Sequence, residues 1–521
     1  MINRRQFLAL GGAAIAAPGL ARAAGGSVLR FVPHASPAVL DPTWNTAYVT
    51  RNHAYLVFDT LFGQDAAFRY QPQMLDGFET TDGGRRWTLR LREGQKFHDG
   101  TPVLARDCVA SIRRWARRDD IGRTLMAATD ELLAANDRDI VFRLKQPYPL
   151  LPMALGKTCL MTAAMMPARL AEGDPDRAIA EMVGSGPFRF KADEYVANSR
   201  LVYERFADYR PREAGDVAGT AGPKRVALDR VEWAIMPDPS TASAALQAGE
   251  VDWWEQPHAD MLPLLRRDRR LQVGTLDPTG YIASLRVNHL QGPTANPAIR
   301  RLMLAAISQR DVVMAMAGTD PALWRERVGF FCPGTDLASE AGMSALEAPR
   351  DAAALAAAGY RGETLRLLVP GDLPLNQLAS TVVADALSRA GFKVDVATMD
   401  FGSVLQRRMK QEPIDQGGWS AWLVLNAGTD QLNPGVHATL RGDGSLGNGW
   451  CRSPAIEAAR HAWLAAPDAA TQLDAARRLQ ETAYTEVPYI PLGQTAMLTA
   501  MRTTFTGMIP GLPVFWGLRP A

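Results

Sequence analysis

The sequence predicts an α/β fold with two or three domains. Along most of the chain, stretches with apolar residues at helical spacing alternate with short stretches in which every second residue is apolar. The length of 521 residues supports that domain count, since one domain takes about 100–200 residues. With 47% hydrophobic and 21% charged residues the chain can bury large cores, which excludes a disordered protein.

The first 23 residues predict an export signal. Arg4 and Arg5 precede an apolar run from Phe7 to Ala17, and Ala21-Arg22-Ala23 is typical of a cleavage site. As a helix this run would rise about 16 Å, too little to cross an apolar bilayer core of about 30 Å. The paired arginines followed by Phe-Leu resemble a twin-arginine signal, with a Sec signal as the alternative. Cleavage near Ala23 would leave a periplasmic mature chain, and no later stretch is long enough to span a membrane.

Short motifs place individual elements along the chain. Trp87–Arg92 alternates apolar and polar residues, which predicts a strand with one buried face, and Asp99-Gly100 predicts a turn after it. Helix starts are predicted where a capping residue precedes proline, because the cap accepts an orphan amide and proline has none to donate. The pattern occurs at Thr101-Pro102, Asp238-Pro239, Asn296-Pro297 and Ser453-Pro454.

The helix after Asn296 is predicted to be amphipathic. Its apolar residues Ile299 and Met303 lie on one side, and Arg300 and Arg301 are expected on the solvent side. Two stretches rich in glycine are predicted to be loops instead, because glycine disfavours regular structure there. They are residues 210–224 and residues 441–449.

Charge and cysteine content exclude further classes. Lys and Arg number 57 against 55 Asp and Glu, a net charge of +2, and three of the positive charges lie in the export segment. A nearly neutral mature chain has no general attraction for nucleic acids or anionic membranes. The four cysteines lie far apart without a Cys-x-x-Cys pair, so no zinc or redox site is predicted. Cys108 with Cys159 and Cys332 with Cys451 could form disulfides, and buried free thiols are the equal alternative.

Motifs of enzymes and cofactor sites are not recognisable. Gly442-x-Gly444-x-x-Gly447 matches a dinucleotide-binding loop only formally, because no strand precedes it and no helix pattern follows. The sequence contains no Gly-x-Ser-x-Gly, no phosphate-binding loop and no His-Glu-x-x-His, and its seven histidines are scattered. We therefore expect no catalytic residues, no metal and no cofactor.

Several motifs occur in the order of one known family. The strongest is Leu91 to Pro102, with Phe97-His98-Asp99-Gly100 at its centre. The others are Leu40-Asp41-Pro42, Val57 to Phe62, Gln73 to Phe78, Gly184 to Phe188, Ala248 to Asp252, Val287-Asn288 and Val487 to Leu492. The chain resembles the extracellular solute-binding proteins of family 5, the binding subunits of peptide-type ABC importers. Read from the residues alone, the Phe97–Gly100 segment is a turn whose His98 and Asp99 bond nearby backbone.

This resemblance implies the periplasmic binding protein fold, with two lobes that close on a ligand around a hinge. The first lobe would comprise residues 24–282 and 490–521, including an extra small subdomain, and the second would comprise residues 283–489. The chain would cross the hinge near Gly280–Ser284 and again near Ile490–Gly493.

Aromatic residues are the predicted walls of the cleft between lobes, because they supply contact area at low entropic cost. The candidates are Trp44, Tyr48, Trp253, Trp254, Trp419 and Trp422, each with burial in a core as the alternative. Dipeptide-binding relatives hold the ligand's ammonium group with an aspartate that precedes a proline. Here Asn433 precedes Pro434, and Asp430 is the candidate substitute. Larger peptides, opines, other amines and ligands without an amine are the alternatives.

The expected function is thus that of a monomeric, non-catalytic binding protein that delivers a peptide or similar solute to an inner-membrane ABC permease. Two alternatives follow from other observations. The twin-arginine pattern is common to proteins folded before export, which would suit an exported hydrolase or redox enzyme. His437 and His53 would serve a metal-chelate or haem receptor on the same fold.

Overall fold

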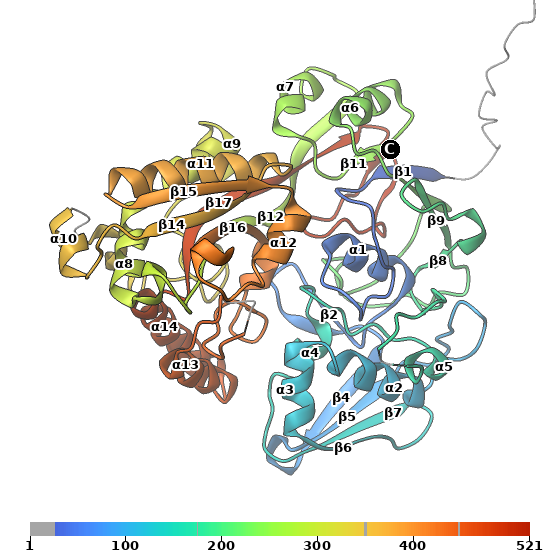
Figure 1. Ribbon diagram of the computed structural model, residues 1–521. Coiled ribbons are helices and arrows are strands. Elements are labelled where there is room, and N and C mark those ends of the chain that lie inside the picture. The colour runs from blue at the N-terminus through green and yellow to red at the C-terminus, as the bar shows by residue number, and fades with distance from the viewer. Residues whose placement is uncertain (1–26, 175, 349–351, 446–448) are drawn as a thin grey trace, which may run out of the picture.

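The computed structural model describes residues 27–174, 176–348, 352–445 and 449–521, so the predicted signal segment lies outside the described residues. These residues form two bodies (Figure 1). We call the body with strands β1–β11 and the C-terminus lobe I, and the body with helices α8–α14 lobe II. The predicted α/β class is confirmed, since helices and strands alternate in both lobes.

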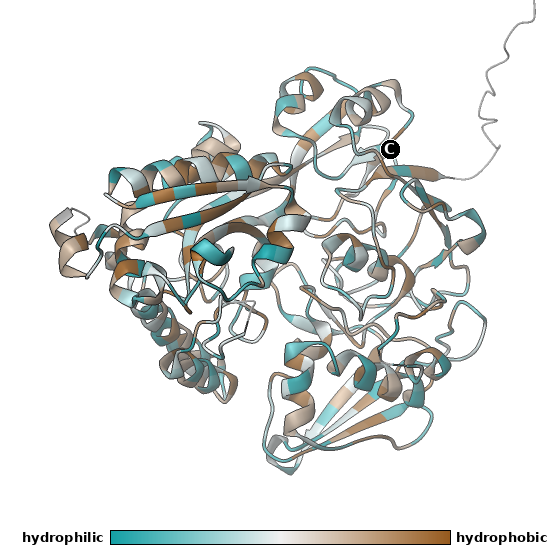
Figure 2. Ribbon diagram, in the orientation of Figure 1, coloured by the Kyte–Doolittle hydropathy of each residue, from teal (hydrophilic) through white to brown (hydrophobic). Residues whose placement is uncertain are grey.

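One large sheet runs through both lobes. Its strand order is β15-β14-β16-β12-β17-β11-β1-β10-β9-β8, and β13 pairs with β17. The strands are β1 (Val28–Val32), β8 (Phe188–Phe190), β9 (Arg200–Arg205), β10 (Arg230–Ala234), β11 (Trp253–Trp254), β12 (Leu271–Val287), β13 (Trp324–Arg325), β14 (Thr364–Pro370), β15 (Lys393–Met399), β16 (Ala421–Ala427) and β17 (Tyr489–Arg502). Figure 2 shows that hydrophobic residues are frequent along these strands and that hydrophilic residues are frequent on the outer helices.

The two longest strands connect the lobes. β12 and β17 are antiparallel neighbours, from Leu271 opposite Arg502 in lobe I to Arg286 opposite Tyr489 in lobe II. Their register is irregular between Thr275 and Tyr281 and again between Ile282 and Ser284, where the ladder is interrupted. Strands bend most easily where ladder hydrogen bonds are missing. The crossing between the lobes therefore contains a stretch that can bend more easily than the rest of the two strands.

Gly280 lies in this irregular stretch, and replacing it with alanine should destabilise the protein. Its φ of +53° is left-handed, and a Cβ there would lie 2.1 Å from the carbonyl oxygen of Thr495. We expect Gly280→Ala to lower the free energy of unfolding by at least about 1–2 kcal/mol, measured by chemical denaturation. Gly274→Ala on the same strand is the control, because a Cβ there meets no atom within 4 Å. Equal losses in both variants would contradict this prediction.

Lobe I carries a small subdomain with its own antiparallel sheet, in the order β4-β5-β7-β6, covered by α2 and α3 (Figure 1). The predicted strand 87–92 corresponds to β5. The elements are β4 (Leu75–Thr81), β5 (Arg86–Leu91), β6 (Thr129–Ala134), β7 (Asp139–Leu144), α2 (Ala105–Ala116) and α3 (Asp120–Ala128). The rest of lobe I contains α1 (Tyr48–Val57), β2 (Phe62–Gln64), β3 (Tyr70–Pro72), α4 (Leu151–Gly156), α5 (Ala168–Ala171), α6 (Pro239–Ala248), α7 (Leu262–Leu265), β18 (Phe505–Thr506) and β19 (Arg519–Pro520).

In lobe II, helices pack against parallel strands. α11 contacts β14, β15 and β16, and the pair α13 and α14 lies at the outside, with α14 against α8. The helices are α8 (Pro297–Ala306), α9 (Gln309–Ala317), α10 (Ala352–Ala357), α11 (Pro374–Arg389), α12 (Phe401–Arg407), α13 (Pro454–Leu464) and α14 (Ala469–Glu486). The short 3₁₀ segment η8 (Gly428–Gln431) follows β16.

Three of the four predicted helix caps are confirmed. Asp238, Asn296 and Ser453 each accept a backbone amide at the start of α6, α8 and α13. The start predicted at Thr101-Pro102 was wrong. α2 begins at Ala105 instead, because the Thr101 hydroxyl bonds Asp99 and Pro102 lies in a bridge opposite Lys96.

The expectation that Arg300 faces solvent was also wrong. Its side chain is buried and donates to the carbonyl oxygens of Glu486 and Val487. A helix leaves its last carbonyl groups without internal partners, and an arginine can satisfy several of them at once. Arg300 therefore joins α8 to the end of α14 rather than pointing to water.

All four cysteines are buried and none of them forms a disulfide, which decides between the two alternatives left open by the sequence. Burial raises the pKa of Cys159, Cys332 and Cys451 to about 12 each, so the thiols stay protonated at neutral pH. Protonated buried thiols react slowly. In the described part of the chain, no helix is both long and apolar enough to cross a bilayer.

Candidate ligand site between the lobes

One tyrosine joins the two lobes at the centre of the molecule. Tyr48 begins α1 in lobe I, and its hydroxyl donates a short hydrogen bond to Asp430 of η8 in lobe II. The same hydroxyl oxygen accepts the backbone N–H of Ala427 at 2.9 Å. Burial and the Asp430 charge raise the pKa of Tyr48, so its hydroxyl keeps the proton that it donates. Two residues predicted from the sequence, Tyr48 and Asp430, are therefore in direct contact.

Buried polar atoms without partners concentrate on η8. Asp430 is only 8% exposed, and its Oδ1 bonds no group among the described residues. The Thr429 hydroxyl and both polar atoms of the Gln431 amide are likewise buried without partners there. Leaving a buried polar group unbonded costs about 1–3 kcal/mol, so a cluster of them indicates a place where other polar groups bind. The sequence did not predict Thr429 or Gln431, although both adjoin Asp430.

Cationic side chains surround this carboxylate. Burial raises the pKa of Asp430, and hydrogen bonding by Tyr48 and the charges of Arg51 and Lys157 act against that rise. Arg51 is buried with its guanidinium 4.9 Å from the Tyr48 ring centre, and it donates to the Thr158 carbonyl oxygen. Residues three apart on a helix share a face, which is why Arg51 accompanies Tyr48. That spacing was the available sequence signal for Arg51, which the prediction missed.

Two small cavities lie between the lobes. One is lined by His34, Tyr48, Arg51 and Glu255 of lobe I and by Ala427 of lobe II, among others. The other lies between α3 and the segment 435–441. Each has a volume of about 10 Å³, room for about one water molecule. A peptide can therefore enter only if the lobes move apart.

The predicted tryptophans lie mostly in cores. Trp253 is fully buried and donates to the Thr499 hydroxyl at 2.7 Å, and Trp254 packs in a separate apolar cluster of lobe I. Trp419 and Trp422 lie in one cluster of lobe II, where the Arg408 guanidinium lies 5.4 Å from the Trp422 ring.

Trp44 is half-buried, and the guanidinium of Arg118 lies 3.9 Å from its ring centre. None of the five predicted tryptophans lines either cavity between the lobes. The structure thus brings Tyr48 and Asp430 together but leaves the tryptophans apart from them.

The strongest sequence motifs serve structure, as their residues alone suggested. The His98 side chain donates from Nε2 to the Gly186 carbonyl oxygen at 3.0 Å, so two separate motifs bind each other inside lobe I. Asp99 accepts the backbone N–H and the hydroxyl of Thr101. Burial lowers the pKa of His98 to about 4.

The two histidines considered for a metal lie apart. His53 is buried in lobe I beside the Tyr203 hydroxyl, and His437 bonds the Tyr489 hydroxyl in lobe II. Burial lowers the pKa of each to about 3. Within the described ranges, no group of three His, Cys, Asp or Glu side chains is placed to hold a metal ion.

Comparisons with known proteins agree with this architecture. Residues 69–436 match the family model described as bacterial extracellular solute-binding proteins, family 5 middle. The chain is 34% identical, over all of both chains, to the probable peptide ABC transporter periplasmic-binding protein y4tO of Sinorhizobium fredii. It is 22% identical to the glutathione-binding protein GsiB of Escherichia coli strain K12, over 90% of this chain and 89% of that protein.

Solved structures share the fold. AgaA of A. tumefaciens R10 in complex with agropinic acid has a TM-score of 0.77 at 19% identity, covering 95% of this chain and 99% of that one. DppA of Helicobacter pylori in complex with the peptide STSA has a TM-score of 0.75 at 18% identity, covering 95% and 98%. The predicted two-lobed fold is therefore confirmed. This chain belongs to the family 5 bacterial extracellular solute-binding proteins.

Proposed function

We propose that this protein is the periplasmic binding subunit of an ABC importer and that it captures a peptide or similar amine-bearing solute between its lobes. Family membership and the relative named as a peptide transporter component support this function. The observation that carries the location is the cluster of unbonded polar atoms on η8, opposite Tyr48 and Arg51. The protein acts as a monomer, releases its ligand chemically unchanged to an inner-membrane permease, and is exported by its first 23 residues.

The hinge lies where β12 and β17 lose regular pairing. The register of β12 shifts between Thr275 and Tyr281 and again between Ile282 and Ser284, which supports a crossing that includes the expected stretch Gly280–Ser284. On β17 the residues opposite these shifts run from Leu498 to Pro491, which overlaps the expected second crossing at Ile490–Gly493. Lobe I would then contain residues 24–282 and 490–521 to within a few positions, and lobe II residues 283–489.

Asp430 is the group that receives the ligand's ammonium. Its Oδ2 already accepts from Tyr48, and its Oδ1 has capacity for a further donor. The Gln431 amide and the Thr429 hydroxyl would bond the neighbouring polar groups of the ligand. Of the seven residues predicted from the sequence, Tyr48 and Asp430 carry this proposal. Four of the five tryptophans belong to the cores of the lobes, and Trp44 is half-buried.

Closure and binding are coupled through Tyr48. Its hydrogen bonds to Asp430 and Ala427 span both lobes, so they exist only when the lobes are together. A ligand that bonds η8 and α1 at once favours the closed form, and a permease that recognises that form would respond to the ligand.

Two measurements test the function. Calorimetry with a pool of tripeptides with free termini should show one saturable site, and X-ray scattering should show that the protein becomes more compact on binding. Hydrolysis of the bound peptides would contradict the proposed non-catalytic role. A chain that binds none of these peptides would contradict the proposed ligand class.

Tyr48→Phe should weaken binding of that tripeptide pool by about tenfold or more. Without the hydroxyl, the closed form buries Asp430 Oδ2 and the Ala427 amide unbonded, which costs about 1–3 kcal/mol. The open form leaves both groups to water, so the free energy of unfolding should change little.

Tyr203→Phe is the matched control for this substitution. It also removes a buried hydroxyl, one that bonds His53 at 2.9 Å entirely inside lobe I. We expect it to change stability and leave affinity intact. Equal affinities of wild type and Tyr48→Phe would show that this hydroxyl does not hold the lobes together.

A further inference from the structure

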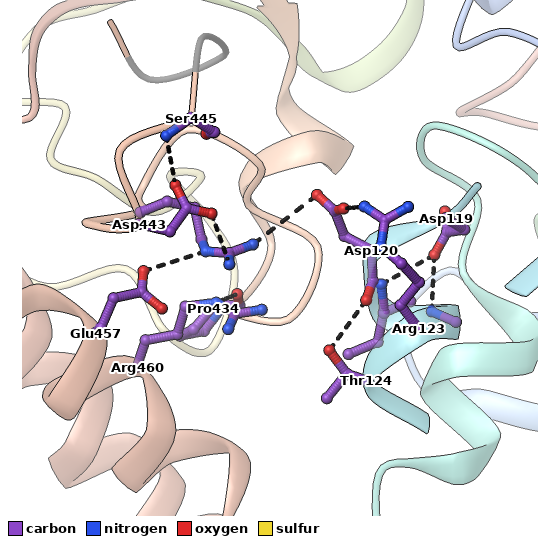
Figure 3. Close-up of polar contacts among 12 residues, drawn as sticks. Asp119, Asp120, Arg123, Thr124, Pro434, Asp443, Ser445, Glu457 and Arg460 are labelled. Atoms are coloured by element: carbon purple, nitrogen blue, oxygen red, sulfur yellow. Dashed lines mark hydrogen bonds and ion pairs between the residues drawn. The ribbon is translucent and has the colours of Figure 1, made fainter. Parts of the chain in front are cut away.

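The second cavity between the lobes contains an arginine without an acidic partner. Arg460 on α13 is only 3% exposed and lines this cavity, and its Nε donates to the Pro434 carbonyl oxygen at 3.1 Å. No hydrogen bond or ion pair joins its two terminal nitrogens to a described residue. Figure 3 shows the side chain extending from α13 toward lobe I. Burial lowers the pKa of Arg460 to about 10, so the guanidinium is charged at neutral pH.

A second donor without an acceptor comes from lobe I. The Tyr148 side chain is 4% exposed, and its hydroxyl has no partner among the described residues. Burial raises the pKa of Tyr148, and the Arg460 charge acts against that rise, which places the two groups within electrostatic range of each other. The guanidinium can only donate and the hydroxyl has a proton to donate, so an anionic acceptor can bond both groups at once.

The carboxylates beside the cavity are already engaged. Asp119 accepts the Ile121 and Gly122 amides that begin α3 and forms an ion pair with Lys157 at 2.7 Å. Asp120 contacts Arg123 and lies 3.9 Å from Arg441 (Figure 3).

Arg441 also takes the two remaining acids. It contacts Asp443 at 2.9 Å and Glu457 at 3.2 Å. Each of these acids is thus held by another cation or by backbone amides. Glu457 and Asp120 act on the Arg460 charge, but no described acid forms an ion pair with it. A buried guanidinium binds carboxylates strongly, because its charged hydrogen bonds are poorly replaced by water.

We propose that Arg460 and Tyr148 bind an anionic group of the transported ligand, a carboxylate distant from its ammonium. This inference rests on the proposed function. One chain segment connects the two places, since η8 with Asp430 is followed directly by residues 435–438, which line the cavity. Lys157 also links them, because it lines the cavity and its charge acts on Asp430. The favoured ligand class is therefore a zwitterionic peptide that lies along residues 428–438.

The test compares two tripeptide pools that differ only at the C-terminus, one with free carboxylates and one with amides. Calorimetry on the full mature protein should show that wild type prefers the acid pool by about ten- to a hundredfold. Tyr148→Phe and Arg460→Gln should each reduce that preference at least about tenfold, with a smaller loss of affinity for the amide pool than for the acid pool. Tyr148→Phe removes only an unbonded oxygen, so this variant should fold even if Arg460→Gln does not.

Tyr484→Phe is the matched control, because its hydroxyl is also buried without a partner but lies within lobe II beside Phe330. It should keep the full preference for the acid pool. Equal binding of both pools by wild type, or an unchanged preference in Tyr148→Phe and Arg460→Gln, would overturn the inference and leave the proposed function standing. If neither pool binds, both fail. If sodium acetate alone stabilises wild type but not Arg460→Gln, while both pools bind equally, the site takes a free anion and the assignment to the ligand is wrong.

Discussion

Replacing Asp430 with asparagine should weaken binding of a tripeptide with a free amino terminus by at least about a hundredfold. The carboxylate is buried, and its Oδ1 is available to an ammonium group. A buried ammonium that loses its anionic partner loses about 3–5 kcal/mol, and each 1.4 kcal/mol is a factor of ten. Calorimetry with one defined tripeptide, such as trialanine, measures the loss directly.

Asp252→Asn provides the matched control. Asp252 is also a buried aspartate whose pKa is raised by burial, but it accepts the Arg30 backbone amide within lobe I. That variant should alter stability and leave peptide affinity intact. An Asp430→Asn protein that binds as tightly as wild type would show that the ligand's ammonium lies elsewhere.

The affinity of wild type for the ligand's ammonium group should depend on pH in one direction. Because burial raises the pKa of Asp430, its carboxylate takes up a proton at a higher pH than an ordinary aspartate does. Affinity for the ammonium should therefore fall as the pH drops through this raised pKa, and the Asp430→Asn protein should show no such fall.

The folding stability of the unliganded closed form should depend on pH in the opposite direction. Its stability is fully present below the ordinary aspartate pKa and is lost as the pH rises through the raised value, so acidification stabilises it.

Local sequence patterns predicted where helices and strands begin better than they predicted which side chains are buried. Caps at Asp238, Asn296 and Ser453 were read correctly because a cap depends only on residues within one turn. Thr101 failed because Asp99, two residues earlier, competes for its hydroxyl. Arg300 failed because the carbonyl groups that bury it belong to α14, far along the chain.

The tryptophans show why a residue that lines a cleft cannot be distinguished from a core residue by sequence alone. Trp253 and Trp254 form β11, which lies between β1 and β17 in the sheet. The two side chains point to opposite faces, and each face is covered by a different apolar cluster. A central strand covered on both sides buries every residue, and nothing in a tryptophan's own neighbourhood reveals whether its strand is central.

The candidate site was predictable only in part, for the same reason. The sequence indicates Tyr48 only as an aromatic residue and Asp430 only as an acid near a proline. Their contact spans 382 positions and depends on how the lobes meet. Arg460 and Tyr148 are ordinary residues of a helix and a loop, and their significance lies in what each fails to bond in the folded protein. Such information exists only in three dimensions.

Removing the Asp59–Lys224 ion pair, one of several buried ion pairs in lobe I, should give the largest loss of stability. Lys224 Nζ contacts Asp59 Oδ1 at 2.8 Å with both side chains at most 1% exposed, and Tyr209 donates to the other oxygen of Asp59. The ammonium also lies 4.6 Å from the Trp516 ring centre, so one cluster joins distant parts of the chain. Asp59→Asn leaves this ammonium buried without its anion. We expect the free energy of unfolding to fall by about 3–5 kcal/mol in chemical denaturation followed by tryptophan fluorescence.

An exposed ion pair of the same length separates burial from charge. Lys96 and Asp208 also lie 2.8 Å apart, but their side chains are 46% and 53% exposed. Water solvates either group when the other is removed, so Asp208→Asn should change stability little. Among the described residues, Asp59 and Lys224 form no hydrogen bond or ion pair with η8, so the peptide affinity of folded Asp59→Asn protein should match wild type. A similar loss of stability in both variants would mean that pairing itself, rather than the burial of an uncompensated charge, determines the contribution of Asp59.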